Sequence, residues 1–134
     1  MNSQTILHLG LTREATKIHS ALLDLDAGAS RFAPLNAWMR EHLGEDLSVE
    51  RLAAKAAMSP RNFARAYAAE TGVTPAKAVE RLRAERARAA LAQGGAIQEI
   101  ARKMGFGDPE RMRRAFVRLY GAPPAAMRRT MRGA

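Results

Sequence analysis

The stretch MGFGDPERMRRAF, residues 104–116, places two glycines around one phenylalanine in a chain otherwise rich in alanine and arginine. Gly105 predicts the left-handed residue that commonly ends a helix. The Asp-Pro-Glu run at 108–110 predicts the start of the next helix, because aspartate caps it, proline fits its first turn and glutamate suits the positive end of its dipole. We expect Phe106 to fold into the angle between the two helices. The stretch therefore predicts the turn of a helix-turn-helix.

The same pattern occurs earlier in the chain. The segments VERLAAKAAMSPRNFARAYAAETGVTP (49–75) and IQEIARKMGFGDPERMRRAFVRLYGAPP (97–124) align along their whole length, with one extra residue in the break of the second. Serine-proline opens the second helix of one segment where aspartate-proline opens that of the other. Internal similarity of this kind indicates one structural unit used twice. We predict helix-turn-helix units at about 49–71 and 97–120.

Helical periodicity divides the second helix of each unit into an apolar face and a charged face. The second helix of a helix-turn-helix enters the major groove with its N-terminal residues at base edges, where arginine pairs with guanine and asparagine with adenine. The predicted base-reading residues are Arg61, Asn62, Arg65, Glu110, Arg111 and Arg114. The predicted phosphate-contacting residues are Ser59, Arg113, Arg118 and Arg128.

Uninterrupted helix formers fill residues 75–93 between the two units, and glycines follow them. We predict a linker helix there, roughly 30 Å long at 1.5 Å per residue. Because successive major-groove segments on one face of DNA lie ~34 Å apart, this helix can place two recognition helices without a dimer. Its charged side chains are expected to form i,i+4 pairs or to lie near phosphates. Shorter helices are expected over 34–44 and 123–131, which makes the fold class all-α.

Composition points to a polyanionic partner. The 134 residues fit one domain, and the formal net charge is +9. The whole excess lies in residues 73–134, where fourteen Lys and Arg stand against five Asp and Glu. Such a basic half favours nucleic acid first and an anionic membrane second. The chain contains no cysteine, which excludes disulfides and thiolate metal sites and suits a reducing cytoplasm.

Residues that would support catalysis, a cofactor or a metal are not assembled into a pattern. The three histidines, at positions 8, 19 and 42, are scattered and have no carboxylate at ligand spacing. The Gly-Phe-Gly run at 105–107 lacks the third glycine and the preceding strand of a dinucleotide site. No apolar run approaches the ~20 residues of a membrane helix, and the N-terminus lacks the features of a signal peptide. We therefore predict no catalytic residue, no cofactor and no metal.

Residues 34–134 resemble the DNA-binding domain of AraC/XylS-type transcription regulators. The second unit, EIARKMGFGDPERMRRAFVRLYGAPPAAMRR, is similar to that family's signature, and FAPLNAWMREHLGEDLSVERLAAKAAMSPRNFAR is most similar to members fused to an amidotransferase-like domain. The resemblance implies a homeodomain-like pair of helix-turn-helix subdomains with about seven helices. It also implies a cytoplasmic, nucleoid-associated regulator that binds double-stranded promoter DNA, with RNA polymerase as a second partner.

Three positions depart from the family pattern. Met127 stands where an aromatic residue is usual, which would loosen the closing helix. Pro109 and Ala64 stand where many members carry polar base-contacting residues. Those two base contacts are therefore not carried over to this chain.

Residues 1–33 are too few to form the sensor or oligomerisation domain that such regulators usually carry. An amphipathic helix is expected from about Thr12 to Leu25, with Ala15, Ile18 and Leu22 on the same face as Leu25. The segment is either the end of a linker from a missing upstream domain or an extra packing element of a small stand-alone regulator. We expect a monomeric DNA-binding domain, with any dimerisation through a missing domain or residues 1–33.

Two other classes of function remain open at this point. One is a non-specific architectural DNA-binding protein, because attraction to the phosphate backbone supplies most non-specific affinity. The other is a basic helix that binds a membrane surface or a partner protein. Sequence-specific regulation is the leading interpretation, because capped turns and outward arginines occur in register in both units.

Overall fold

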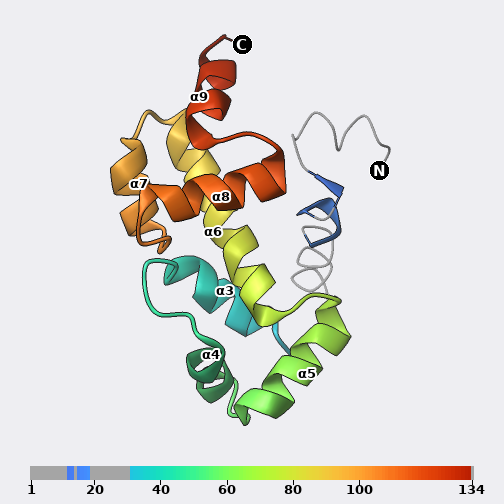
Figure 1. Ribbon diagram of the computed structural model, residues 1–134. Helices are drawn as coiled ribbons and strands as arrows, with labels where there is room; N and C mark the ends of the chain where they lie inside the picture. Colours follow the sequence, from blue (N-terminus) through green and yellow to red (C-terminus); the bar gives the residue numbers. More distant parts are fainter. Residues whose placement is uncertain (1–11, 14, 19–30, 134) are drawn as a thin grey trace.

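The computed structural model describes residues 12–13, 15–18 and 31–133 (Figure 1). Within these residues every regular element is a helix, which confirms the all-α class. Residues 13 and 15–18 are also helical. The helices are α3 (Ala33–Glu41), α4 (Val49–Lys55), α5 (Pro60–Thr71), α6 (Pro75–Ala92), α7 (Ile97–Lys103), α8 (Pro109–Tyr120) and α9 (Pro124–Gly133).

Local side-chain chemistry accounts for the boundaries of the two recognition helices. Ser59 accepts a hydrogen bond from the amide of Asn62 at the start of α5 (3.3 Å). Asp108 accepts one from the amide of Arg111 at the start of α8 (2.8 Å). A proline follows each cap, and each helix ends at a glycine with a left-handed backbone. The predicted starts of both helices are confirmed.

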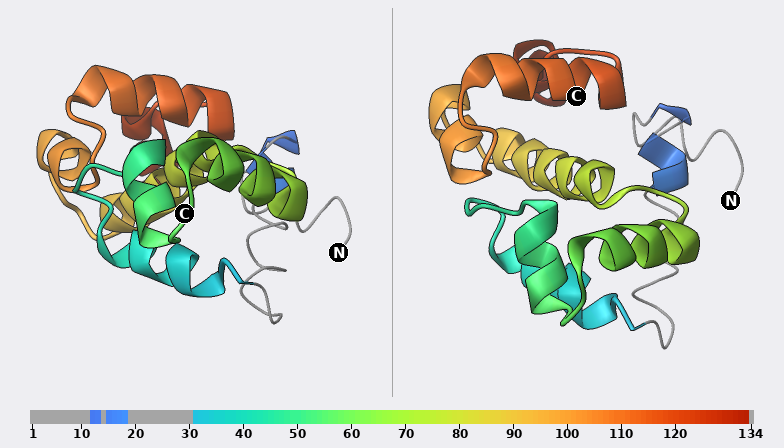
Figure 2. Two further views of the ribbon diagram at one scale, coloured as in Figure 1. Left: turned by 90° about the horizontal axis from the view of Figure 1, so that it is seen from below. Right: turned by 60° about the horizontal axis from the view of Figure 1, so that its bottom comes forward.

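Two hydrophobic cores share the long helix α6. The first core packs α3, α4 and α5 against one part of α6, through Val79 and Leu82. The second packs α7, α8 and α9 against the remainder, through Ala87 and Leu91. Figure 2 shows α6 lying between the two groups of helices. The predicted linker helix therefore connects the two units and also forms part of both their interiors.

Three aromatic side chains pack together in the first core. Phe63 and Tyr67 of α5 are fully buried beside Phe32, and the Phe32 and Phe63 rings meet edge to face at 5.8 Å. The Tyr67 hydroxyl donates a hydrogen bond to Oδ1 of Asn36 in α3 (2.8 Å), and both side chains are completely buried. This bond fixes the back of α5 against α3.

The N-terminal segment lies across both cores. The Thr12 amide donates to the carbonyl of Leu119 at the end of α8 (3.0 Å). Ala15 belongs to the second core and Ile18 to the first, and both are buried, as their predicted face requires. The predicted positions Leu22 and Leu25 lie outside the described residues. Packing thus crosses the predicted boundary at residue 33. No described helix is long and apolar enough to span a membrane.

Candidate DNA interface

The turns of the two units have the same hydrogen-bonding pattern. We call residues 49–71 the first unit and residues 97–120 the second unit. In the first, the amide of Met58 donates to the carbonyl of Ala53 (2.9 Å). In the second, the amide of Phe106 donates to the carbonyl of Ala101 (3.0 Å). These are the bonds that close a helix through one left-handed residue, and each turn contains such a residue one position earlier.

Phe106 folds inward from the second turn, as predicted. Its side chain is 8% exposed and belongs to the second core with Met112 and Phe116. Met58, the matching residue of the first turn, is only partly buried and packs at the edge of the first core. The angle between the helices is therefore filled by a large ring in the second unit and by a flexible side chain in the first.

The outer face of α5 presents polar side chains to solvent. Arg61, Asn62 and Arg65 are exposed, opposite the buried Phe63 and Tyr67. Among the described residues neither arginine has a carboxylate within ion-pair distance. All three side chains lie in the first half of the helix, which is the part that reaches base edges in this motif. Both guanidinium groups are therefore available to an incoming acceptor.

The outer face of α8 carries more charge, and that charge is paired. Glu110 binds Arg113 (2.7 Å) and lies 3.6 Å from Arg114, while Asp108 lies 3.8 Å from Arg111. The hydrogen bond from Arg113 holds the pKa of Glu110 below its ordinary value and raises the pKa of Arg113. All five side chains are at least half exposed, so the pairs are weak and can exchange for phosphate oxygens.

Two predicted phosphate contacts are used within the protein. Arg118 binds Glu80 of α6 through two nitrogens, one of them at 3.2 Å, and joins the end of α8 to the linker helix. Arg128 of α9 donates to the carbonyl of Gly95, and its Nε is buried without a hydrogen-bond partner. Arg118 thus connects α8 to α6, and Arg128 connects α9 to the segment that follows α6.

Sequence reasoning did not identify Asn36 as a support of the first recognition helix. Asn36 is 31 residues away from its partner Tyr67, and α3 brings the two together only in the folded chain. A polar residue on the inner face of a predicted helix was the available signal, because buried polar groups need partners.

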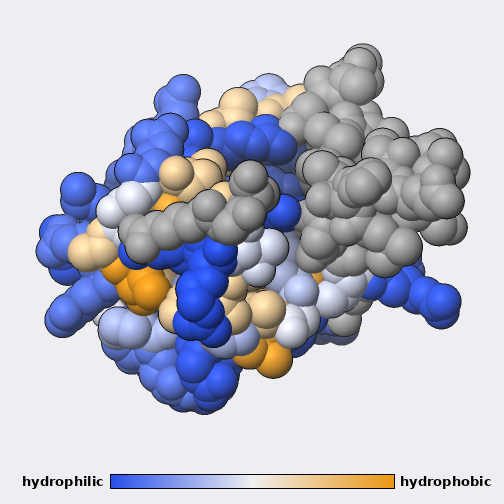
Figure 3. Space-filling view, turned by 90° about the horizontal axis from the view of Figure 1, so that it is seen from above, coloured by the Kyte–Doolittle hydropathy of each residue, from blue (hydrophilic) through white to orange (hydrophobic). Residues whose placement is uncertain are grey.

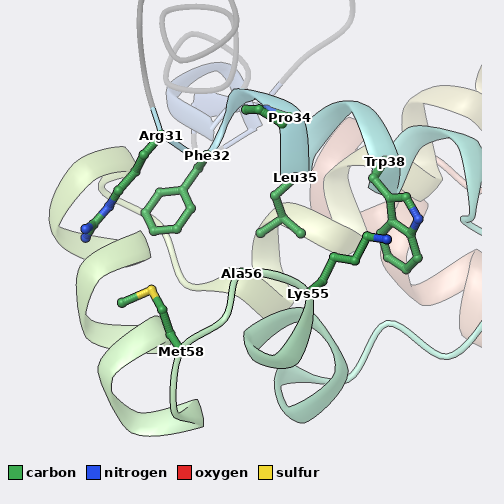
Figure 4. Close-up of a pocket in the computed structure, with 8 residues that line it drawn as sticks. All are labelled: Arg31, Phe32, Pro34, Leu35, Trp38, Lys55, Ala56 and Met58. Carbon is green, nitrogen blue, oxygen red and sulfur yellow. The ribbon is translucent and has the colours of Figure 1, made fainter.

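A pocket of 420 Å³ lies beside the first turn, between α3 and the end of α4 (Figure 4). Phe32, Leu35 and Met58 form its apolar lining. Lys55 extends alongside Trp38, with its ammonium 4.9 Å from a ring centroid. Within the described residues no three His, Asp or Glu side chains are grouped so as to hold a metal.

The surface seen from the α9 end is dominated by hydrophilic side chains, with small separate apolar areas between them (Figure 3). Among the described residues Val117, at 41%, is the exposed large hydrophobic side chain. A helix that lies in a membrane surface needs a continuous apolar face. The apolar face of α8 is instead buried in the second core. This packing disfavours the membrane-surface alternative.

The family model described as a helix-turn-helix domain matches residues 52–130, from α4 to α9. This chain belongs to the AraC-type helix-turn-helix family. The AraC-type resemblance drawn from residues 34–134 is confirmed, and the match covers both recognition helices.

Curated relatives of this AraC-type chain are regulators. It is 35% identical over 119 residues to the HTH-type transcriptional regulator Rv1931c of Mycobacterium tuberculosis, covering 88% of this chain and 46% of the relative. It is 31% identical over 106 residues to the HTH-type transcriptional activator RhaS of Escherichia coli, covering 78% of this chain and 38% of the relative. The chain thus spans less than half the length of these two relatives.

Solved structures of this AraC type have the same architecture. The DNA-binding domain of the global transcriptional factor AdpA, solved with a target DNA, gives a TM-score of 0.73 at 37% identity, covering 76% of this chain and 93% of that one. A regulator from Chromobacterium violaceum with an AraC-type DNA-binding domain gives a TM-score of 0.65 at 25% identity, covering 71% and 86%.

Proposed function

We propose that this chain is a sequence-specific, double-stranded DNA-binding part of a transcription regulator, which inserts α5 and α8 into successive major-groove segments. The observation that carries the proposal is the pair of capped, outwardly polar recognition helices held by one rigid helix. The 18 residues of α6 correspond to about 27 Å, against ~34 Å between groove segments on one face of DNA. The complex of the AdpA domain with its target DNA supports this use of the fold.

The residues divide into two roles under this proposal. Base edges are read by Arg61, Asn62, Arg65, Glu110, Arg111 and Arg114. Phosphates are held by Ser59, Arg113, Arg118 and Arg128. The N-termini of both helices are exposed to solvent at Ser59 and Asp108, and the positive end of a helix dipole favours a nearby anion.

The remaining expectations follow from the same arrangement. Both recognition helices belong to one chain, so one copy is sufficient for a bipartite site and the DNA-binding part acts as a monomer. Promoter DNA in the cytoplasmic nucleoid is the primary partner, and RNA polymerase is the second. The proposed activity is recognition and requires no catalytic step and no cofactor.

The test is selection of double-stranded DNA from a random pool by the 134-residue chain, followed by titration on the selected and scrambled sequences. We expect one enriched bipartite sequence. If roughly 6–8 phosphates are neutralised, log K should fall against log salt with a slope of about −5 to −7. Equal affinity for selected and scrambled DNA would indicate an architectural protein instead. A slope near zero would contradict DNA binding altogether.

A further inference from the structure

The loop between α3 and α4 lies directly against the turn of the second unit. A Cβ placed on Gly44 of this loop would lie 2.7 Å from the carbonyl oxygen of Lys103. A Cβ on Gly105 would overlap the carbonyl oxygen of Leu43. The Leu43 side chain is buried in the first core, and Phe106, beside Gly105, is buried in the second. Each side of this contact is thus fixed in a different core.

Arg83 of α6 closes the same contact from the linker helix. Its Nε donates to the carbonyl of Leu43 (3.1 Å), and its Nη2 donates to the carbonyl of Glu45 (2.9 Å). A Cβ on Gly105 would lie 2.6 Å from Nε and 2.9 Å from Cζ of this guanidinium. Burial lowers the pKa of Arg83, and the nearby Asp46 carboxylate opposes that effect. The side chain was expected to form an i,i+4 pair or to lie near phosphate, and it binds backbone instead.

This arrangement restricts motion of the second unit against the first core, to which the α3–α4 loop is anchored by Leu43. A planar guanidinium that donates to two carbonyls fixes both the distance and the orientation of the loop relative to α6. A single ammonium cannot do this. The two glycines bring the backbones so close that no side chain fits between them. We call Gly44, Arg83 and Gly105 the joint. It lies where α6 passes from the first core to the second.

We infer that the joint sets the position of α8 relative to α5 and thereby determines the spacing between half-sites that the protein accepts. This inference rests on the proposed function. One added base pair moves a half-site by ~3.4 Å along the DNA axis and turns it by about 35°. Because the joint allows no movement at this contact, α8 cannot follow that displacement. Arg83, whose guanidinium is bound to two backbone carbonyls, is therefore a positioning residue for recognition.

The experiment uses the 134-residue chain and the bipartite DNA that the wild type selects, with the spacer shortened by one, unchanged or lengthened by one base pair. We expect the wild type to lose about tenfold or more in affinity when the spacer changes. Arg83→Met should reduce that loss to about threefold or less while base preference within each half-site is retained. Arg86→Met is the matched control, because Arg86 lies exposed on the same helix and loses the same charge.

Two further variants, Arg83→Lys and Gly44→Ala, show whether the effect comes from the position of α8 or from lost charge or lost stability. Arg83→Lys keeps the charge but cannot span both carbonyls, so we expect it to relax the spacing preference as well, by less than Arg83→Met. Gly44→Ala has a backbone conformation open to alanine, so its Cβ acts only through Lys103. It should change the ratio of affinities between spacers by about threefold or more.

The possible results test the role of the joint separately from the proposed function. Spacing profiles identical to the wild type in both Arg83→Met and Gly44→Ala, even with uniformly weaker binding, would overturn the joint and leave the proposed function standing. The same relaxation in Arg86→Met would also overturn it. If the wild type selects no bipartite sequence, the proposed function fails, and the inference fails with it.

Discussion

The two turns follow the same backbone path but have different surroundings. Ala57 and Gly105 occupy the same position, with φ of 58° and 85°. Ala57 is exposed, whereas a Cβ on Gly105 would overlap Leu43 and crowd Arg83. The turn by itself therefore accepts alanine in a left-handed conformation. The glycine of the second turn is required by the α3–α4 loop, because a Cβ at this position would overlap the carbonyl oxygen of Leu43.

The recognition helices differ in a parallel way. Arg61 and Arg65 of α5 have no ion-pair partner in the part of the chain that the structure describes. On α8, Glu110 pairs with Arg113 and lies near Arg114. Under the proposed function, binding by α8 exchanges these pairs for DNA contacts, whereas α5 binds without such an exchange. The larger number of arginines on α8 therefore does not by itself predict that α8 binds DNA more tightly than α5.

The largest expected effect is on stability, and it distinguishes the side chains that fill the two turns, Phe106 and Met58. Phe106→Ala should lower the free energy of unfolding by ~3–5 kcal/mol, because it empties a buried site in the second core. Met58→Ala should cost less than about 2 kcal/mol, since Met58 is only partly buried. Chemical denaturation of both variants measures the difference. Equal costs would show that the two turns are packed alike.

The next effect tests why the second turn needs glycine. Gly105→Ala should destabilise the fold by about 2–5 kcal/mol, from the left-handed backbone and the overlap with Leu43 together. Gly72→Ala is a suitable control, because Gly72 also has positive φ but nothing lies within 4 Å of its added Cβ. Equal losses of stability for both variants in a thermal melt would show that the overlap with Leu43 contributes nothing to the cost.

A third effect compares the predicted base-reading arginines with a predicted phosphate-contacting arginine. Arg61→Ala and Arg65→Ala should each cost ~1–3 kcal/mol on the selected DNA and relax preference at one base position. Arg118→Ala should weaken selected and scrambled DNA alike and make the salt slope shallower by about one. Titration on both DNAs provides the measurement. Equal losses on both DNAs for the two α5 variants would mean that α5 is not a reading helix.

The smallest effect concerns the first turn. Ala57→Gly should stabilise the protein by up to about 1 kcal/mol, because relief of the left-handed strain exceeds the added freedom of the unfolded chain. The melting temperature should rise by a few degrees, about 2–6 °C. Ala54→Gly, on the exposed side of α4, should lower it instead. A lower melting temperature for Ala57→Gly would show that the positive φ of Ala57 carries no strain.

Much of the fold could be predicted because its signals are local. Caps at Ser59 and Asp108 marked helix starts, and the repeat located both turns. The linker helix, expected to end at residue 93, ends at Ala92. The outward positions of the predicted reading arginines followed from helical periodicity alone.

The contacts that organise the site could not be predicted, because they join residues far apart in sequence. Arg83 binds a carbonyl 40 residues away, and Arg118 binds a carboxylate 38 residues away. Periodicity shows that such a side chain faces outward from its own helix. It does not show which other element comes to meet it.

The division of α6 between two cores has a consequence for unfolding. Val79 and Leu82 are buried by one group of helices, and Ala87 and Leu91 by the other. Most of the stability of a helix in a protein comes from tertiary packing, so the 18 residues of α6 depend on both groups of helices. Loss of either core removes the surface on which the other is assembled. We therefore expect the two units, although they are copies of one motif, to unfold as a single cooperative body.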